Sequence, residues 1–194
     1  LLEQGTLTEY SIDVRHVITR YLVSGTDMQS RHEWDNTGNE LDNPYFKPLR
    51  FRVIDREGKT ISTPISRNDE VWVEIIGEAK KIDSLLTVGY ALYEENGTML
   101  YHTFHTDTAE PQWPLLRPGH CALRSRLPVD LLNEGVYRME CIGDLYDVRW
   151  LFAPGENAPR IEFEVQGGLS QSPLWVRKRR GLFAPVMNWS VTFQ

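Results

Sequence analysis

Short segments in which apolar and polar residues alternate run through most of the chain, a pattern typical of β-strands that bury one face. Two of these segments, Glu70–Ile76 and Arg160–Gln166, alternate throughout. Asn96-Gly97 separates two others, and Asn-Gly between alternating segments indicates a hairpin. The remaining strands are predicted at Leu49–Asp55, Thr60–Ile65, Leu85–Tyr93, Thr98–Thr106, Cys121–Leu127 and Val136–Ile142. This pattern predicts an all-β fold, an immunoglobulin-like or jelly-roll β-sandwich of two antiparallel sheets.

Residues 11–23 have helical rather than strand periodicity. The apolar residues that share one face of this helix are Val14, Val17, Ile18, Tyr21 and Leu22. Gly25 could end the helix, and the polar segment 24–44 that follows is typical of a linker or long loop. We therefore expect a short N-terminal helix ahead of a sandwich that occupies residues 25–194.

The composition and net charge of the chain indicate which kinds of partner it can bind. The 194 residues are 41% hydrophobic and 25% charged, as is usual for one globular domain with an extension. A net charge of −6 argues against a phosphate-backbone partner, so we expect no nucleic acid. The basic run at residues 177–180 is too short to change this. No apolar run approaches the roughly 20 residues of a membrane-spanning helix.

The two cysteines, Cys121 and Cys141, are too few for a disulfide scaffold and form no CxxC pair. We expect both to be reduced, as in a cytosolic protein, with one buried disulfide as the alternative. The chain opens at Leu1 without an initiator Met or a signal sequence. We therefore expect it to be a piece of a longer cytoplasmic protein.

Motifs for catalysis or metal binding are absent from the sequence. There is no nucleophile motif such as G-x-S-x-G and no phosphate-binding G-x-x-x-x-G-K-[ST]. His102 and His105 lie three positions apart in a predicted strand, which directs them to opposite faces. Asp107 shares a face with His105, but two ligands do not complete a zinc site. We expect no catalytic residues, no metal and no cofactor.

The outward faces of the central strands are the candidates for a binding surface. In the strand 98–106, Leu100 and Phe104 are expected to face the core, and small residues at 89 and 91 lie between outward aromatics. Sugars present apolar C–H faces ringed by hydroxyls, so a site for them needs flat aromatic surfaces and a few polar groups. The predicted carbohydrate-binding residues are Trp72, Thr87, Tyr93, Tyr101, Thr103 and His105. The alternative is that a loop, the tail or a second subunit covers these aromatics.

Other aromatic residues lie outside the predicted strands. Trp113 and Trp150 are predicted either to contact a ligand at the rim of the site or to plug an end of the sandwich. The tail, residues 167–194, joins a Gly/Ser stretch to an apolar end that includes Leu182, Phe183, Val186 and Trp189. An apolar end behind a flexible joint must be buried on its own sandwich or on a partner's. We expect a homodimer held partly by this tail, whose last strand either stays on its own sandwich or crosses to the neighbouring copy.

Four stretches of the chain carry longer motifs in a fixed order. Leu1–Gly5 has a short "L-x-x-G" turn, and Val14–Leu22 is similar to a helix with "E-V-I-x-x-Y". Farther along the chain, the pattern "W…P-G-N-E…V-x-V-x-D-x-x-G" is matched by Trp34, residues 37–40 and Leu49–Gly58. Thr37 stands where this pattern has Pro. The ending "L-P-x-x-L-L-x-x-G-x-Y…I-x-F-x-V…R-G…W" is matched by Leu127–Tyr137, Ile161–Val165, Arg180-Gly181 and Trp189.

Together these motifs resemble Wzt-type ATPase subunits of ABC transporters that export O-antigen polysaccharides, in their C-terminal carbohydrate-binding half. The resemblance implies that residues 1–24 are the end of the ATPase domain and its connecting helix, and that residues 25–194 bind carbohydrate. It implies recognition, without catalysis, of the terminal sugars of a lipid-linked O-antigen polysaccharide.

The implied partners are this glycan, a second copy of the chain, the ATPase domain and the transmembrane subunit. The implied location is the cytoplasmic face of the inner membrane. The alternative function is a structural module that dimerises or docks the ATPase halves without binding sugar.

Overall fold

The computed structural model describes residues 32–167 and 178–193, residues 172 and 174, and the backbone pairing of residues 2–3 and 6–7. Contacts within the chain define two units, residues 1–31 and residues 32–194. The boundary between them lies a few residues after the predicted one, which fell between residues 24 and 25. In the first unit, β1 (Leu2–Glu3) pairs with β2 (Thr6–Leu7) in antiparallel fashion. The helix predicted over residues 11–23 lies outside the described residues.

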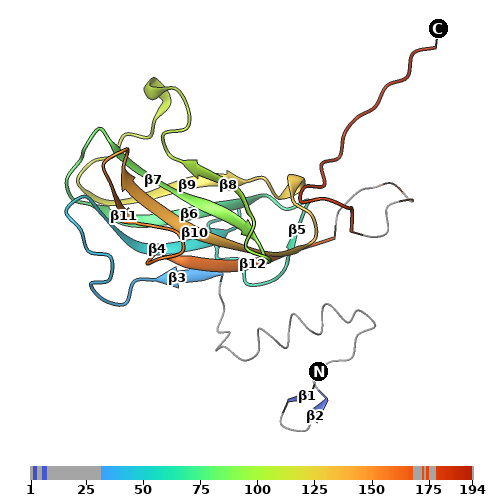
Figure 1. The fold of residues 1–194 in the computed structure, drawn as a ribbon, viewed down its shortest axis with the longest axis horizontal. Helices are drawn as coiled ribbons and strands as arrows, with labels where there is room; N and C mark the ends of the chain where they lie inside the picture. Colours follow the sequence, from blue (N-terminus) through green and yellow to red (C-terminus); the bar gives the residue numbers. More distant parts are fainter. Residues whose placement is uncertain are drawn as a thin grey trace. The chain divides into compact units, whose positions relative to one another are not determined.

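The second unit is a β-sandwich of two sheets (Figure 1). The four-stranded sheet is antiparallel, in the order β3 (Glu33–Asp35), β4 (Phe46–Ile54), β6 (Val71–Ala79), β9 (Gly119–Leu127). The six-stranded sheet has the order β5 (Ile65–Ser66), β12 (Arg160–Gln166), β10 (Gly135–Leu145), β7 (Leu86–Glu94), β8 (Met99–Phe104), and β11 (Arg149–Phe152) pairs with the end of β10.

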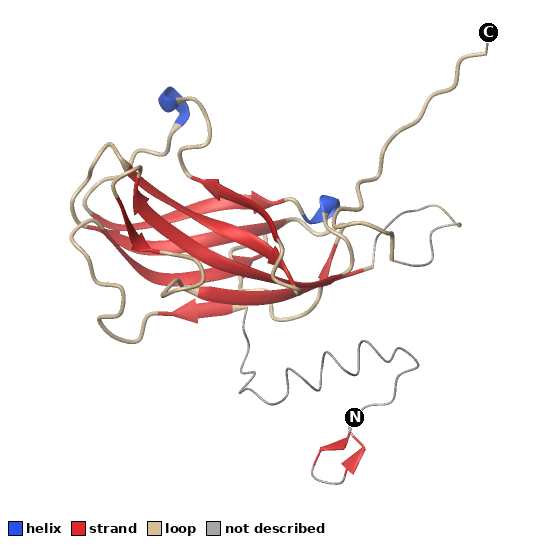
Figure 2. Ribbon diagram, in the orientation of Figure 1, coloured by secondary structure: helices blue, strands red, loops and turns tan. Residues whose placement is uncertain are grey.

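The predicted all-β sandwich is confirmed. Every pairing in the six-stranded sheet is antiparallel except that of β5 with β12, which is parallel. The helical segments of the described chain are two short 3-10 turns, η1 (Glu110–Gln112) and η2 (Val129–Leu131), as Figure 2 shows. The Asn96-Gly97 hairpin also forms between β7 and β8, where Gly97 takes a φ of 87°.

The core lies between the sheets and follows the alternation of the strands. On β6, Val71, Val73 and Ile75 are buried, and on β12 the buried side chains are Ile161, Phe163 and Val165. Burying one such side chain contributes about 1.5–3 kcal/mol relative to leaving it exposed. The apolar face of each strand therefore determines which side of its sheet faces the other.

Two strands of the sandwich escaped prediction. β3 lies in the segment 24–44 that was predicted to be a linker or loop, and β11 lies beyond the predicted end of β10. β10 continues to Leu145 and turns into β11 through Asp147, which has a φ of 55°. Asp tolerates this left-handed conformation better than most residues, so the turn forms without the Gly or Asn that signals a hairpin.

The predicted orientation of β8 is wrong. Tyr101 is paired with Leu92, and Thr103 with Tyr90, so both point between the sheets rather than outward. Phe104 is paired with Gly89 on the outer face, although it was predicted to face the core. The physical reason is a register shift between Leu92 and Tyr93, because one extra residue in a strand reverses the faces of all that follow.

Gly89 is the residue that permits this arrangement of β8. A Cβ atom at position 89 would lie 1.9 Å from the carbonyl oxygen of Thr103 and 2.8 Å from the Cα of Phe104. Both are backbone atoms, which cannot move aside without distorting the strand. Glycine is therefore required where the two strands come this close.

A crevice of about 320 Å3 opens between the sheets along the edges β8 and β9. Its lining includes Thr103 and His105 from one sheet and Ser125 from the other. The Ser125 hydroxyl donates a hydrogen bond to the Tyr90 hydroxyl at 3.2 Å. The hydroxyl groups of Tyr90 and Tyr101 lie 3.5 Å apart. These polar groups satisfy one another across the sandwich, and burial raises the pKa of both tyrosines.

His105 is held in the crevice wall as a neutral ring. Its Nδ1 lies 3.1 Å from the Val88 nitrogen and 3.2 Å from the Val88 carbonyl oxygen, so it accepts from the one or donates to the other according to the tautomer of the ring. Burial lowers the pKa of His105, and the opposing effects of the Val88 backbone and Asp107 are smaller. The ring is therefore a structural part of the crevice wall, level with the buried Val88.

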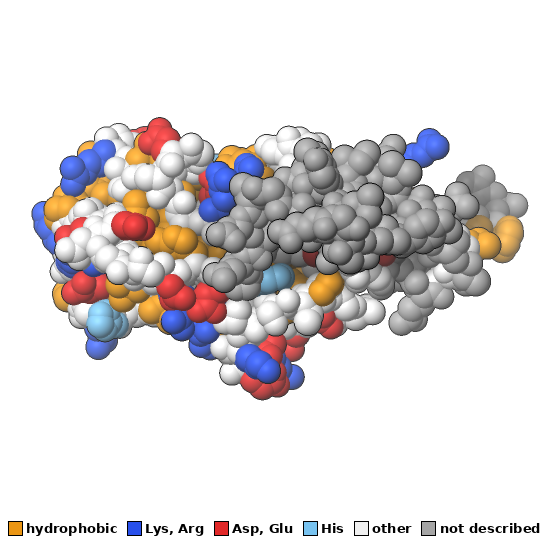
Figure 3. Space-filling model, turned by 90° about the horizontal axis from the view of Figure 1, so that it is seen from below, with side chains coloured by type: hydrophobic (Ala, Val, Ile, Leu, Met, Phe, Trp, Pro, Cys, Tyr) orange, Lys and Arg blue, Asp and Glu red, His pale blue; other side chains and the backbone are white. Residues whose placement is uncertain are grey.

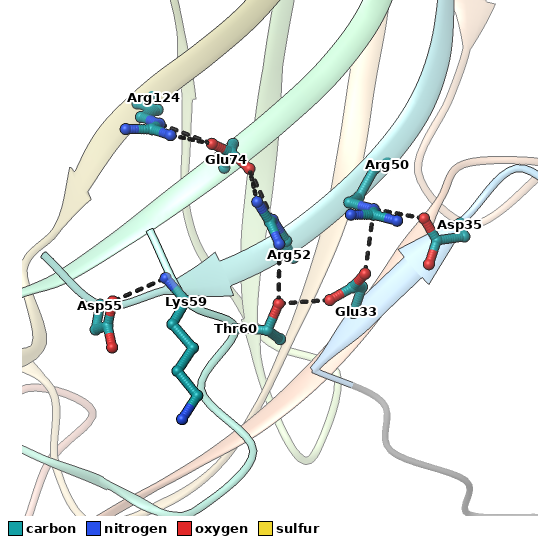
Figure 4. A network of polar contacts seen from close by, with 9 residues as sticks. All are labelled: Glu33, Asp35, Arg50, Arg52, Asp55, Lys59, Thr60, Glu74 and Arg124. Atoms are coloured by element: carbon teal, nitrogen blue, oxygen red, sulfur yellow. Dashed lines mark hydrogen bonds and ion pairs between the residues drawn. The ribbon is translucent and has the colours of Figure 1, made fainter. Parts of the chain in front are cut away.

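An ion network covers the outer face of the four-stranded sheet (Figure 4). Glu74 on β6 is only 1% exposed and lies between Arg52 on β4, at 2.6 Å, and Arg124 on β9, at 2.7 Å. Thr60 connects Arg52 to Glu33 through two further hydrogen bonds. A buried carboxylate is costly unless it is paired, so Glu74 binds the three strands to one another.

We predict that Gly89→Ala lowers the free energy of unfolding by about 1–3 kcal/mol, because the added methyl group collides with the β8 backbone. Urea denaturation measures the change. Gly38→Ala is the matched control, since a Cβ there has nothing within 4 Å. Equal stability of Gly89→Ala and the wild type would show that β8 does not need this close approach.

We predict that His105 makes the domain less stable in mild acid. Its folded pKa lies below the unfolded value of 6.5, so the unfolded chain binds the proton more readily. The free energy of unfolding should therefore fall as the pH drops through 6.5, until the folded ring is protonated too.

Denaturant melts between pH 7.5 and 5 measure this slope. His105→Asn keeps a hydrogen-bond acceptor for Val88 and should make the slope shallower, whereas His120→Gln at the exposed edge of β9 should not. His32 also has a pKa lowered by burial and contributes in the same direction, so part of the slope should persist. An unchanged slope in His105→Asn would contradict the prediction.

Candidate functional site

The candidate site is a groove of about 590 Å3 on the outer face of the six-stranded sheet. Its floor is formed by β7, β8 and β10, and one wall is the β10–β11 hairpin, which lies at the left end of the sandwich in Figure 1. The opposite wall is the start of the loop after β8. The groove is lined by Thr87, His102, Phe104, Thr106, Asp107 and residues 144–150.

The hairpin wall is apolar and open to solvent. Tyr146, Val148 and Trp150 are exposed by 61%, 62% and 57%, respectively. They alternate along the chain, and the backbone of this turn is fixed by hydrogen bonds from Val148 N to Leu145 O and from Tyr146 N to Leu85 O, both 2.8 Å. The hairpin therefore presents large apolar side chains that the sandwich itself does not cover.

Carboxylates line the floor and the opposite wall. Asp144 on β10 is flanked by Trp150 on one side and Thr87 on the other, and its Oδ1 accepts a hydrogen bond from the Thr87 hydroxyl. Asp107 Oδ2 accepts from the Thr103 hydroxyl at 2.5 Å and from the Phe104 N–H at 3.0 Å. Each carboxylate is thus oriented through one oxygen, and among the described residues its other oxygen makes no hydrogen bond.

A small apolar cluster on the same outer face adjoins the groove through Phe104. It consists of Ala91, Tyr93 and Ile142, with Phe104 packed against them. His102 lies beside Phe104, with ring centroids 5.4 Å apart. The floor is therefore firmly packed, while the hairpin wall projects.

Three of the six predicted site residues lie on outer faces. Thr87 lines the groove, as described above. Tyr93 is on the same face but only 8% exposed, because the Arg138 guanidinium lies 4.7 Å from its ring centroid. Trp72 faces outward on β6, beside Ile54 and Arg126, and so lies on the other sheet.

The other three, Tyr101, Thr103 and His105, face the crevice between the sheets instead of the outer surface. The predicted surface therefore does not exist as one patch, since its members are divided between the two outer faces and the interior. Two causes produce this difference: the register shift of β8, and the placement of β6 in a sheet different from that of β7 and β8.

Most of the groove residues were not among the predicted site residues. Trp150 was predicted at a rim or as a plug, and the structure places it in the groove wall. The missed residues are His102, Phe104, Thr106, Asp107, Asp144, Leu145, Tyr146, Asp147, Val148 and Arg149. The alternation of Tyr146, Val148 and Trp150 is visible in the sequence. It indicates an exposed apolar surface only once the β10–β11 hairpin is known.

Within the described part of the chain, no cluster of three or more His, Cys, Asp or Glu is placed to hold a metal ion. Cys141 is buried and Cys121 half-buried, both are free thiols, and burial raises the pKa of each. Among the helices of the described residues, none has the length and apolarity to cross a bilayer.

The arrangement fits a ligand that offers both apolar surface and hydroxyl groups. Exposed aromatic rings pack against C–H faces, and carboxylates accept hydrogen bonds from hydroxyls. On the face seen in Figure 3, the described acidic and basic side chains lie interspersed with apolar ones. A nucleic-acid interface instead gathers its basic side chains on one face.

No family model matches the sequence, and a search of curated proteins finds no match. Among solved structures, the chain is similar to the crystal structure of the C-terminal domain of Wzt. The TM-score is 0.53 and the sequence identity 13%, with 83% of this chain and 87% of that chain covered. The chain therefore has the fold of the Wzt C-terminal domain.

Proposed function

We propose that this domain is a non-catalytic glycan-recognition module, and that the outer-face groove holds the terminal sugars of its ligand. The observation that carries the proposal is the hairpin wall of Tyr146, Val148 and Trp150, which is exposed beside oriented carboxylates. Large apolar side chains on a monomeric surface mark contact sites, and this set lies beside a hollow rather than on a flat face.

The wider role that we propose is in O-antigen export. The fold is that of the Wzt C-terminal domain, and the sequence motifs resemble the same ATPase subunits. In this role the domain recognises a lipid-linked polysaccharide at the cytoplasmic face of the inner membrane. It then works beside the ATPase domain and the transmembrane subunit of an ABC transporter.

We predict that Trp150→Ala weakens glycan binding about tenfold or more without unfolding the domain, because the ring is exposed and its loss leaves no core cavity. Tyr146→Ala should act in the same direction. Binding to a glycan array, followed by calorimetry with the best oligosaccharide, measures the effect.

Trp72→Ala is the control that separates the two outer faces. It should leave binding unchanged, because Trp72 lies on the four-stranded sheet. Loss of binding in Trp72→Ala alone would place the site on that sheet, as the sequence predicted. No glycan binding by the wild type would favour the structural, non-sugar alternative.

The tail supports the proposal of a homodimer. Residues 179–184 are anchored to the sandwich: Ala184 is buried, its N–H donates to Leu131 O at 2.9 Å, and Asn133 Nδ2 donates to Arg179 O and Gly181 O. The residues that follow are exposed and leave the sandwich as an extended chain (Figure 1). These exposed apolar residues are Val186 (59%), Met187 (66%), Trp189 (93%), Val191 (75%) and Phe193 (89%).

From Met187 onward, apolar and polar residues alternate strictly, as in a strand that buries one face. A single chain leaves this face open to water, so we propose that a second copy covers it. This assignment differs in detail from the sequence-based one, since Ala184 and its neighbours are held at home and only the segment beyond them is free to exchange.

We predict that deleting residues 186–194 converts a dimer into a soluble monomer, because the anchor at 179–184 stays in place. Deleting residues 168–194 should also destabilise the fold, since it removes the carbonyl groups to which Asn133 and Arg67 donate. Sedimentation equilibrium at high micromolar concentration distinguishes these states. A monomeric full chain, or a shortened chain that still dimerises, would refute the tail as the dimer contact.

A further inference from the structure

The lining of the groove carries more negative than positive charge. Its lining includes three carboxylates, Asp107, Asp144 and Asp147, and one guanidinium, Arg149. The Arg149 side chain lies over the Tyr45 ring, with its Cζ atom 5.4 Å from the ring centroid, and Lys81 lies over the same ring at 5.3 Å. The Arg149 guanidinium is therefore engaged with Tyr45, and the carboxylates outnumber it in the groove lining.

The carboxylates are positioned to accept hydrogen bonds. Thr87 holds Asp144, and Thr103 and the Phe104 N–H hold Asp107, each through one oxygen. The second oxygen of each makes no hydrogen bond to the described residues. An oriented carboxylate binds a hydroxyl through a charge-assisted hydrogen bond, which is stronger than a neutral one.

We infer that the groove selects neutral, hydroxyl-bearing sugars and rejects glycans whose terminal residue carries a carboxylate or a phosphate. This inference rests on the proposed function, since it names the ligand class of the same site. A neutral sugar donates hydroxyl hydrogens to Asp107 and Asp144 while its C–H face packs on Trp150. An anionic group in the same place meets like charge from these carboxylates, and like-charge juxtaposition is a strong means of rejecting wrong partners.

The test uses an array of matched pairs, in which each neutral oligosaccharide is printed beside the same oligosaccharide carrying one terminal uronic acid or phosphate. We expect the neutral member of each bound pair to bind at least about tenfold more tightly at 0.1 M salt. At 1 M salt the difference should shrink, because the screening length falls from about 10 Å to about 3 Å.

Variants assign the selectivity to the groove. Asp107→Asn with Asp144→Asn keeps the shape of both side chains and should reduce the preference for the neutral member several-fold. Asp147→Asn is a second, independent variant, since Asp147 is exposed and Asn tolerates its left-handed backbone. Glu95→Gln is the matched control, an exposed carboxylate at the other end of β7 from Thr87, and should change nothing.

The outcomes separate this inference from the proposed function. If anionic glycans bind as tightly as their neutral counterparts and Trp150→Ala abolishes both, the charge selectivity is wrong and the glycan site stands. If the preference persists unchanged in both aspartate variants, these carboxylates are not its source and the inference fails. If no glycan binds, or binding is indifferent to Trp150→Ala, the proposed function fails and the inference fails with it.

Discussion

Gly89 and the backbone of β8 lie closer together than any side chain would allow, since a Cβ atom on Gly89 would lie 1.9 Å from a carbonyl oxygen. This approach accompanies the register shift that turns Tyr101 and Thr103 toward the other sheet. The same shift brings Phe104 to the outer face, where it lines the groove and packs against Ala91, Tyr93 and Ile142. Both the crevice between the sheets and the floor of the candidate site therefore depend on one close contact between two backbones.

The carboxylates on the outer faces are of two kinds, buried ones paired with arginines and accessible ones that line the groove. Glu74 on one sheet and Glu140 on the other are 1% and 2% exposed, and each is paired with two arginines. Because an unpaired buried charge is costly, Glu74 holds arginines of both neighbouring strands in place, and Glu140 holds one on its own strand and one on β12. The carboxylates of the groove differ, since Asp107 and Asp144 are more accessible and are oriented by hydroxyl and amide donors instead.

The β10–β11 hairpin and the tail both expose large apolar side chains, and they are separate in the structure. The β10–β11 hairpin lies at one end of the sandwich, and the tail leaves near the other (Figure 1). The hairpin borders a hollow with oriented polar groups, whereas the tail is an unpaired segment with the alternation of a strand. A hollow suits a small glycan terminus and an unpaired strand suits another protein chain, so glycan recognition and dimerisation need not compete for one surface.

The sequence alone determined the fold class, most strand positions, the Asn96-Gly97 hairpin and the outward side of β7, because alternation with period two is a local property of each strand. It did not determine how β8 aligns with β7, since the shift accompanies a close contact between Gly89 and Thr103, which are fourteen residues apart in the sequence. Nor did it determine that Trp72 and Thr87 belong to different sheets, because strand order is set by which apolar faces pack together. The groove combines residues from β7, the end of β8 and the β10–β11 hairpin, and only the tertiary structure brings these segments to one surface.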